Sequence, residues 1–91
     1  MKFEYDENKS SINLQKHGIN FEDAKELWDD QFDIELPSIN CEDEARFLVI
    51  GEIKGRCHTA IITYRNDIVR IISVRKSRYK EIELYESIKN R

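Results

Sequence analysis

Hydrophobic positions recur with two different spacings along the chain, and these spacings predict both strands and helices. Phe3 and Tyr5 alternate with charged residues, which is the pattern of a short strand with one buried face. Asp6 is suited to cap a helix over residues 7–16. Gly18 is suited to end that helix, because glycine enters the left-handed conformation of a helix C-terminus without steric cost. We therefore expect a strand followed directly by a capped helix.

A second helix is predicted immediately after the first. Asn20 provides its cap, and Asp23 stands at the third position of an approximate capping box. Its apolar residues recur at a spacing of three to four, at Phe21, Ala24, Leu27 and Trp28. The turn between the helices carries Lys16 and His17, where positive charge meets the negative end of the helix dipole. Local capping alone predicts a helix–turn–helix corner with a Lys–His pair at its apex.

Four further strands are expected, at about residues 32–36, 46–53, 57–64 and 68–75. Pro37 cannot donate a ladder hydrogen bond, so it ends the first of these strands or places it at a sheet edge. The strand from residue 46 is apolar on both faces between Phe47 and Ile50, which favours a position inside the sheet. Simple alternation divides the last strand into one face with Val69, Ile71, Ser73 and Arg75 and another with Ile68, Arg70, Ile72 and Val74.

The chain ends in a predicted helix over about residues 78–89, with Ile82, Tyr85 and Ile88 on one stripe. The complete order is β-α-α-β-β-β-β-α, with links of hairpin length between the later strands and a polar loop over residues 38–45. This order predicts an α+β domain spanning residues 1–91, in which helices pack on one face of an antiparallel meander.

Composition indicates the size of the core and the cellular compartment of the protein. The chain has 91 residues, of which 40% are hydrophobic and 36% are charged, enough for one small core under a strongly solvated surface. No stretch approaches the roughly 20 apolar residues of a membrane span. Residues 1–6 lack the apolar run of a signal peptide, and Cys41 and Cys57 form no CxxC unit. Together these features favour a cytoplasmic protein in a reducing environment.

Charge is distributed unevenly between the two halves of the chain. Residues 1–45 hold 4 Lys or Arg against 13 Asp or Glu, whereas residues 46–91 hold 11 against 5. The net charge of −3 by itself argues against a nucleic-acid-binding protein. The basic half is nevertheless able to form one face that meets phosphates or an acidic partner. The alternative is that both halves are ordinary solvated surface.

Basic side chains gather at strand ends in the second half. Arg46 begins one strand, and Arg75 ends another with Lys76 and Arg78 just beyond it. An arginine is costly to bury unpaired, so each must reach solvent, a carboxylate or a ligand. Salt bridges are the simpler interpretation of each arginine taken alone. The available acids are Glu42, Asp43 and Glu44 for Arg46, and Glu81 or Glu83 for Arg75.

Taken together, these residues fit the cleavage of RNA without a metal ion. In that reaction the ribose 2′-hydroxyl attacks its own phosphate, which requires proton transfer and cations beside the phosphorane. Imidazole exchanges protons close to neutral pH, so His17 suits the first task, alone or with Lys16. Arg46 and Arg75 suit the second, and tyrosines at 64, 79 and 85 are able to stack on bases. A site of this kind requires Lys16 and His17 to lie on the same side of the sheet as Arg75.

A zinc site is a weaker alternative. Its possible ligands are His17, Cys41, Cys57 and His58, and their spacing matches no usual zinc pattern. Two buried thiols and a strand histidine are the simpler interpretation of the last three.

The motifs resemble the BrnT family of ribonuclease toxins over nearly the whole chain. The matching segments are Phe3–Asp6, Asn13, Lys16–Ile19, Phe21–Ala24, Glu44–Phe47, Gly51, Arg70–Arg75, Glu81 and Tyr85. The Lys-His-Gly turn together with the Arg-Ile-Ile-Ser-Val-Arg strand is the most specific pair among them.

This resemblance implies a RelE-like α+β fold and a cytoplasmic endoribonuclease toxin of a type II toxin–antitoxin system, which blocks translation and growth without a cofactor. It implies an RNA substrate and a BrnA-like antitoxin that also binds operator DNA, so that the toxin meets DNA only indirectly. Lys16, His17, Arg46 and Arg75 fall on the family's motif positions and take the catalytic assignment. Weaker RNA-binding candidates are Tyr64, Arg70, Lys76, Arg78 and Tyr85.

A function of another class fits the same residues. On this alternative the chain is a non-catalytic interaction domain whose basic sheet face binds an acidic protein, while Lys16 and His17 only cap their helix. A short neighbouring gene that encodes a ribbon-helix-helix protein favours the toxin, and its absence favours the alternative.

Overall fold

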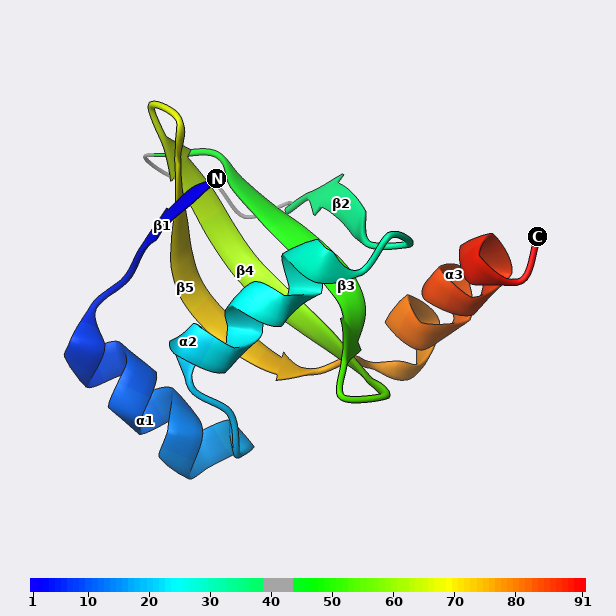
Figure 1. Cartoon of the computed structure of the whole chain (residues 1–91), viewed down its shortest axis with the longest axis horizontal. Helices are drawn as coiled ribbons and strands as arrows, with labels where there is room; N and C mark the ends of the chain where they lie inside the picture. The colour runs from blue at the N-terminus through cyan, green and yellow to red at the C-terminus, as the bar shows by residue number, and fades with distance from the viewer. Residues whose placement is uncertain (39–43) are drawn as a thin grey trace.

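The computed structural model of the protein describes residues 1–38 and 44–91 and confirms the α+β class and the predicted order of elements (Figure 1). The strands are β1 (Lys2–Glu4), β2 (Ile34–Pro37), β3 (Arg46–Ile53), β4 (Arg56–Arg65) and β5 (Ile68–Lys76). The helices are α1 (Glu7–His17), α2 (Phe21–Ala24), the 3-10 helix η1 (Lys25–Asp29) and α3 (Tyr79–Lys89). The predicted second helix therefore continues as a 3-10 helix after four residues. Among these described elements, no helix is long and apolar enough to cross a membrane.

The five strands form one mixed sheet in the order β1-β5-β4-β3-β2. β2 to β5 are antiparallel neighbours, as expected for a meander, whereas β1 pairs in parallel with β5. β3 lies inside the sheet and β2 forms an edge that ends at Pro37, and both placements agree with the sequence pattern. The turn between β3 and β4 has positive φ at Lys54 (52°) and Gly55 (79°), the geometry of a two-residue hairpin turn.

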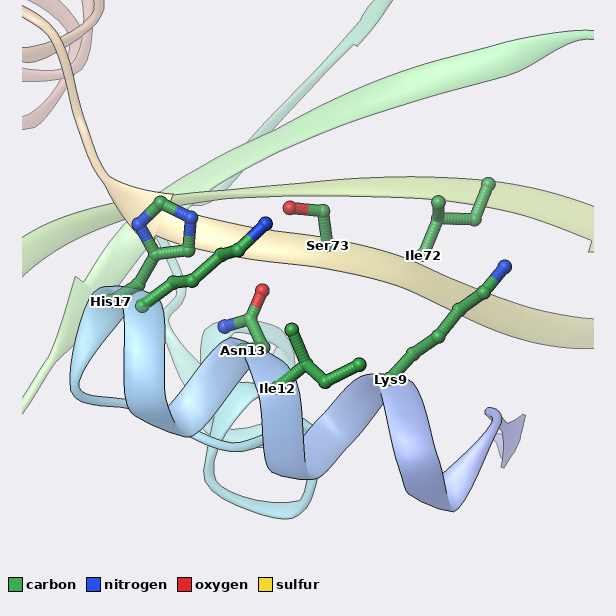
Figure 2. A pocket seen from close by; sticks show the side chains of 7 residues that line it. Lys9, Ile12, Asn13, His17, Ile72 and Ser73 are labelled. Atoms are coloured by element: carbon green, nitrogen blue, oxygen red, sulfur yellow. The ribbon is translucent and has the colours of Figure 1, made fainter.

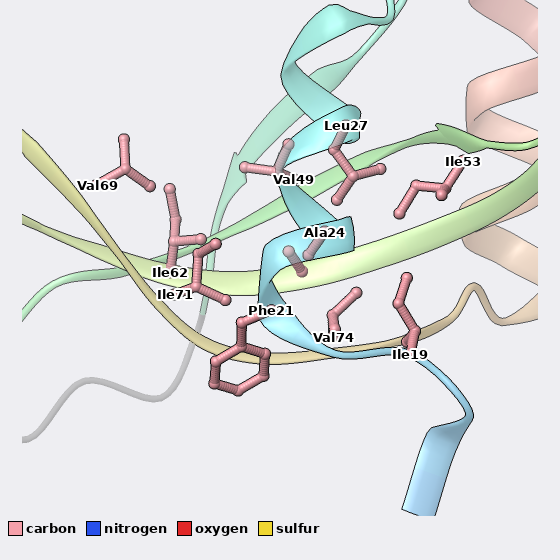
Figure 3. Close-up of a cluster of buried hydrophobic side chains, with 11 residues drawn as sticks. Ile19, Phe21, Ala24, Leu27, Val49, Ile53, Ile62, Val69, Ile71 and Val74 are labelled. Carbon is pink, nitrogen blue, oxygen red and sulfur yellow. The ribbon is translucent and has the colours of Figure 1, made fainter. Parts of the chain in front are cut away.

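The hydrophobic core lies between one face of the sheet and the α2–η1 segment (Figure 3). Its buried members are Ile19, Phe21, Ala24, Leu27, Val49, Ile53, Ala60, Ile62, Val69, Ile71 and Val74. α3 contacts the opposite face, because Glu81 accepts a hydrogen bond from Thr59 and Lys89 donates one to Glu52. Thr59 and Glu52 alternate along their strands with core residues. The expectation that all helices pack on one face is wrong for α3, which Figure 1 shows well apart from α1 and α2.

A β-bulge in β5 decides which way Arg75 points. The ladder between β4 and β5 skips Ile72, so two residues of β5 oppose one step of β4. An extra residue reverses the alternation of faces beyond it. Val74 therefore joins Ile71 in the core, and Arg75 turns to the face opposite the core. The prediction that Ile71 and Arg75 share a face was wrong for this reason.

α1 covers the edge of the sheet where β1 ends. β1 pairs only with residues 68–70 of β5, so within the described sheet no strand borders the rest of β5 on that side. The side chain of Asn13 takes that place. Its Nδ2 donates to the Val74 carbonyl at 2.8 Å, and its Oδ1 accepts from the Val74 N–H at 3.3 Å. Nδ2 also donates to the Ile19 carbonyl at 2.8 Å, so this one buried amide holds α1, the following turn and β5 together.

Candidate functional site

The corner between α1 and α2 is built by the caps that the sequence predicts. The Asp6 carboxylate accepts hydrogen bonds from the first turn of α1, and Gly18 ends the helix with φ of 75°. Asn20 caps α2 through a 2.8 Å bond from the Asp23 N–H. The buried Ser10 hydroxyl accepts from the N–H of Phe21 at 2.9 Å and joins the two helices. These bonds fix the geometry of the corner, and Asn13 holds α1 against the end of β5.

Lys16 and His17 lie at this end of α1 and share a hollow with three basic residues of the other chain half. The hollow has a volume of about 330 Å³ and is lined by Lys16, His17, Arg75, Lys76 and Arg78. The structure thus brings the Lys–His pair next to Arg75, around the sheet edge that α1 covers. We call this hollow the cationic groove. Lys16 and His17 also line a neighbouring hollow along α1, while Arg75 and Arg78 also line one over the sheet with Leu48 and Ile61.

Most cations of this groove have no local counter-charge. Within residues 1–38 and 44–91, no ion pair involves Lys16, His17, Lys76 or Arg78, and no carboxylate lines the groove itself. Lys16, Lys76 and Arg78 bring three unpaired positive charges around one small volume, and an anion bound there relieves their repulsion. The groove is consequently suited to bind phosphate.

Arg75 is the exception, because it forms a two-pronged ion pair with Glu81. Nη1 and Nη2 of Arg75 donate to the two carboxylate oxygens at 2.7 Å and 2.9 Å, and both side chains are less than 20% exposed. Oε1 of Glu81 also accepts from the Arg78 N–H at 2.7 Å and from Thr59 Oγ1 at 3.0 Å. The salt bridge expected for Arg75 taken alone is confirmed. Nη1 of Arg75 also donates to the Lys76 carbonyl at 3.3 Å. These bonds fix the guanidinium plane and leave Nε–H and one Nη2–H for a ligand.

The hydrogen bonds to Glu81 should make the free energy of unfolding fall at acid pH. The Arg75 guanidinium, followed by the Arg78 N–H and the Thr59 hydroxyl, lowers the pKa of Glu81 from 4.5 to about 2. A carboxyl whose pKa is lower in the folded state stabilises the fold above its unfolded pKa, and this contribution disappears as pH falls from about 4.5 through 2. We expect a loss of roughly 3 kcal/mol in unfolding free energy over this range. Urea unfolding at successive pH values measures it, and Glu81→Gln should remove that part of the pH dependence; an unchanged slope in the variant contradicts the assignment.

Comparison with known proteins identifies the family of this chain. Residues 5–81 match the sequence model of the family described as ribonuclease toxin, BrnT, of type II toxin–antitoxin systems. The chain belongs to the BrnT family. The resemblance seen in the motifs is thereby confirmed, and with it a ribonuclease toxin that has an antitoxin partner and RNA targets. No curated protein matches the chain.

In this BrnT-family chain, Arg46 and Arg70 lie away from the cationic groove. Across β4, Arg46 is opposite Thr63 and Arg75 is opposite Thr59. Four residues along a strand correspond to about 13 Å, so the structure does not bring Arg46 to the groove. Arg46 is exposed and forms no ion pair with Glu44, while Glu42 and Asp43 lie outside the described residues. Arg70 is paired with Glu4 at 2.7 Å.

Two of the predicted RNA-stacking tyrosines are also engaged elsewhere. Tyr85 is 1% exposed, and its hydroxyl donates to Asp30 at 2.5 Å, so no ring face is free for a base. Tyr64 lies edge-on to Phe47 and donates to Glu35; burial and this bond raise its pKa to about 12. Tyr85 is a core residue, whereas the Tyr64 ring packs against Phe47 and remains 40% exposed. Tyr79 is the most exposed of the three tyrosines (76%), and it stands next to Arg78 at the N-terminus of α3.

The residues considered for zinc are not gathered in the described part of the BrnT-family chain. Among residues 1–38 and 44–91 no group of three His, Cys, Asp or Glu side chains is placed to hold a metal ion. Cys41 lies outside the described residues. Cys57 is half-buried with a raised thiol pKa caused by that burial, and His58 is buried with Nδ1 2.8 Å from the Arg56 carbonyl. The strand histidine of the simpler interpretation is confirmed, whereas the Cys57 thiol is only half-buried.

Proposed function

We propose that this BrnT-family toxin cleaves RNA in the cationic groove without a metal ion, and so inhibits translation and growth in the cytoplasm until a BrnA-like antitoxin neutralises it. The observation that carries the proposal is the shared hollow of Lys16, His17, Arg75, Lys76 and Arg78. It combines a proton-transfer group with several phosphate-binding cations.

The reaction requires one nucleophile, one proton path and charge stabilisation. The ribose 2′-oxygen forms a bond to the adjacent phosphorus, the bond from phosphorus to the 5′-oxygen breaks, and the products are a 2′,3′-cyclic phosphate and a 5′-hydroxyl. His17, assisted by Lys16, acts either as the base that takes the proton of the 2′-hydroxyl or as the acid that gives a proton to the leaving 5′-oxygen. Arg75 and Arg78 stabilise the extra negative charge of the phosphorane. Glu81 is not the general base, because a carboxyl with a pKa of about 2 is too weak a base near neutral pH. Its role is to orient Arg75 through their ion pair.

The test is cleavage by the purified toxin in the presence of a chelator. We expect an RNA oligonucleotide to be cut equally with and without EDTA, and to carry 5′-hydroxyl and 2′,3′-cyclic phosphate ends. His17→Ala should reduce the rate about 100-fold or more, with little effect on folding because His17 is exposed. Intact RNA would favour the non-catalytic interaction domain, and cleavage that stops with EDTA would rule out the metal-free reaction.

The antitoxin partner and the inhibition of growth and translation are tested by a second experiment. Induced expression should arrest growth and reduce protein synthesis, and co-expression of an adjacent short gene should restore both. Arrest without RNA cleavage would separate toxicity from the proposed chemistry.

A further inference from the structure

A second hollow lies between α1 and β5 (Figure 2). It has a volume of about 180 Å³ and shares Lys16 and His17 with the groove. Its other lining residues are Lys9, Ile12, Asn13, Ile72 and Ser73. Figure 2 shows the side chains of α1 reaching toward β5, with Ser73 and Ile72 across from them. The two hollows therefore adjoin at Lys16 and His17, and we call the hollow beside α1 together with this junction the track.

The α1 side of this track has an unusual composition for a helix face turned toward a sheet. Positions 9, 12, 13 and 16 follow the three-to-four spacing of one helix face, which normally packs apolar residues on the core. Here Asn13 alone is buried, at 6% exposure, and Ile12 is 49% exposed. Lys9 and Lys16 are exposed, and neither forms an ion pair with any residue that the structure describes. Packing explains Asn13, but it explains neither lysine nor the exposed isoleucine.

Lys9 is too far from the cationic groove to serve the same phosphate. It stands eight residues before His17, which corresponds to about 12 Å along the helix axis. A phosphate in contact with His17 and Arg75 therefore leaves Lys9 free for another group of the same ligand. Lys9 lies at one end of the track and His17 at the other, and the apolar side chain of Ile12 lies between them. The Ser73 side chain lies on the opposite wall.

We propose that the hollow between α1 and β5 is a second nucleotide subsite, which holds the part of a single-stranded RNA next to the phosphate that is cut. Lys9 binds the neighbouring phosphate, Ile12 packs against its ribose or base, and Ser73 offers a hydroxyl to the same nucleotide. Single-stranded RNA fits because its bases are free to lie on an apolar side chain, whereas the bases of a duplex are stacked and paired. This inference rests on the proposed function and adds a substrate contact to it.

The subsite is tested by binding rather than by cleavage. The probe is a single-stranded octanucleotide with 2′-O-methyl groups throughout, which cannot be cut by attack of the 2′-oxygen. Its dissociation constant is measured by fluorescence anisotropy at several salt concentrations. Lys9→Ala should weaken binding about 5-fold and reduce the slope of log K against log[salt] by about 0.7, the value for one lost phosphate contact on a single strand. Ile12→Ala should weaken binding about 2-fold and leave the salt slope unchanged, because no charge is lost.

Lys2→Ala is the matched control, since Lys2 is an exposed lysine on β1 that does not line the track. It removes the same charge and should change the dissociation constant less than 2-fold. The subsite is disproved if Lys9→Ala and Lys2→Ala have equal effects, or if the unsubstituted protein does not bind the octanucleotide. Binding without cleavage of the matching RNA supports the subsite and overturns the proposed reaction, so the two failures are distinguishable.

Discussion

Replacing Arg75 with alanine is expected to reduce RNA cleavage by roughly 100- to 1000-fold, the usual cost of removing one donor that stabilises a charged transition state. The same change should lower the free energy of unfolding by about 3 kcal/mol, because it leaves the Glu81 carboxylate buried without its cation. Cleavage rates and urea unfolding curves on the same protein measure the two effects. Loss of activity alone would therefore not show that Arg75 touches RNA.

A double variant separates the two effects of Arg75. Arg75→Met with Glu81→Gln removes both charges, while the side-chain amide oxygen introduced at position 81 is still able to accept from the Arg78 N–H and the Thr59 hydroxyl. We expect most of the stability to return, since apolar or neutral replacement of a buried pair is often harmless. Cleavage should remain low. If cleavage returns together with stability, Arg75 is only a structural residue.

Arg65→Ala is the control for charge. Arg65 is a largely exposed arginine, its ion pair with Glu4 is 4.0 Å long, and it does not line the groove. We expect changes within about 0.5 kcal/mol in stability, as for most surface substitutions. Cleavage by this variant should stay within 2-fold of the unsubstituted protein.

The predictable parts of this molecule are those that depend on neighbours in sequence. Asp6, Gly18 and Asn20 cap their helices within three or four residues, so the corner that carries Lys16 and His17 follows from the sequence alone. Pro37 likewise marks an edge strand by its own missing N–H. Each of these features depends on a few adjacent residues.

The less predictable parts depend on register. Alternation along β5 is correct until Ile72, where a bulge sends Arg75 to the other face. Nothing in the run of Ile and Val residues marks the extra position, because every side chain there is compatible with either face. Arg46 was grouped with Arg75 because both stand at strand ends. In the antiparallel ladder those ends are four residues apart.

The hydrogen-bond partner of a buried aromatic residue was also beyond the sequence. Tyr85 and Tyr79 both lie in α3, yet one is 1% and the other 76% exposed. The Tyr85 hydroxyl donates to the carboxylate of the distant Asp30. Such a partner, 55 positions away, cannot be read from local periodicity.

Asn13 ties the helix that carries Lys16 and His17 to the strand that carries Arg75. Its Nδ2 donates to the carbonyls of Ile19 and Val74, and its Oδ1 accepts from the Val74 N–H. An amide is required here, because one side chain must donate twice and accept once in a buried place. Aspartate has nearly the same shape but, when ionised, only accepts.

Asn13→Asp is therefore expected to lower the unfolding free energy by about 4 kcal/mol at pH 7, since it places a buried carboxylate oxygen against two carbonyls. Asn13→Ala should cost less, about 2 kcal/mol, because it leaves groups unsatisfied without adding repulsion. Asn8→Asp is the control: Asn8 is exposed in the first turn of α1, where a negative charge is neutral or slightly favourable. Urea unfolding compares the three variants. The deficit of Asn13→Asp relative to the unsubstituted protein should shrink at pH 4, because a protonated carboxyl regains one donor. Equal losses for Asp and Ala at pH 7 would show that α1 separates from β5 rather than retaining the bonded arrangement.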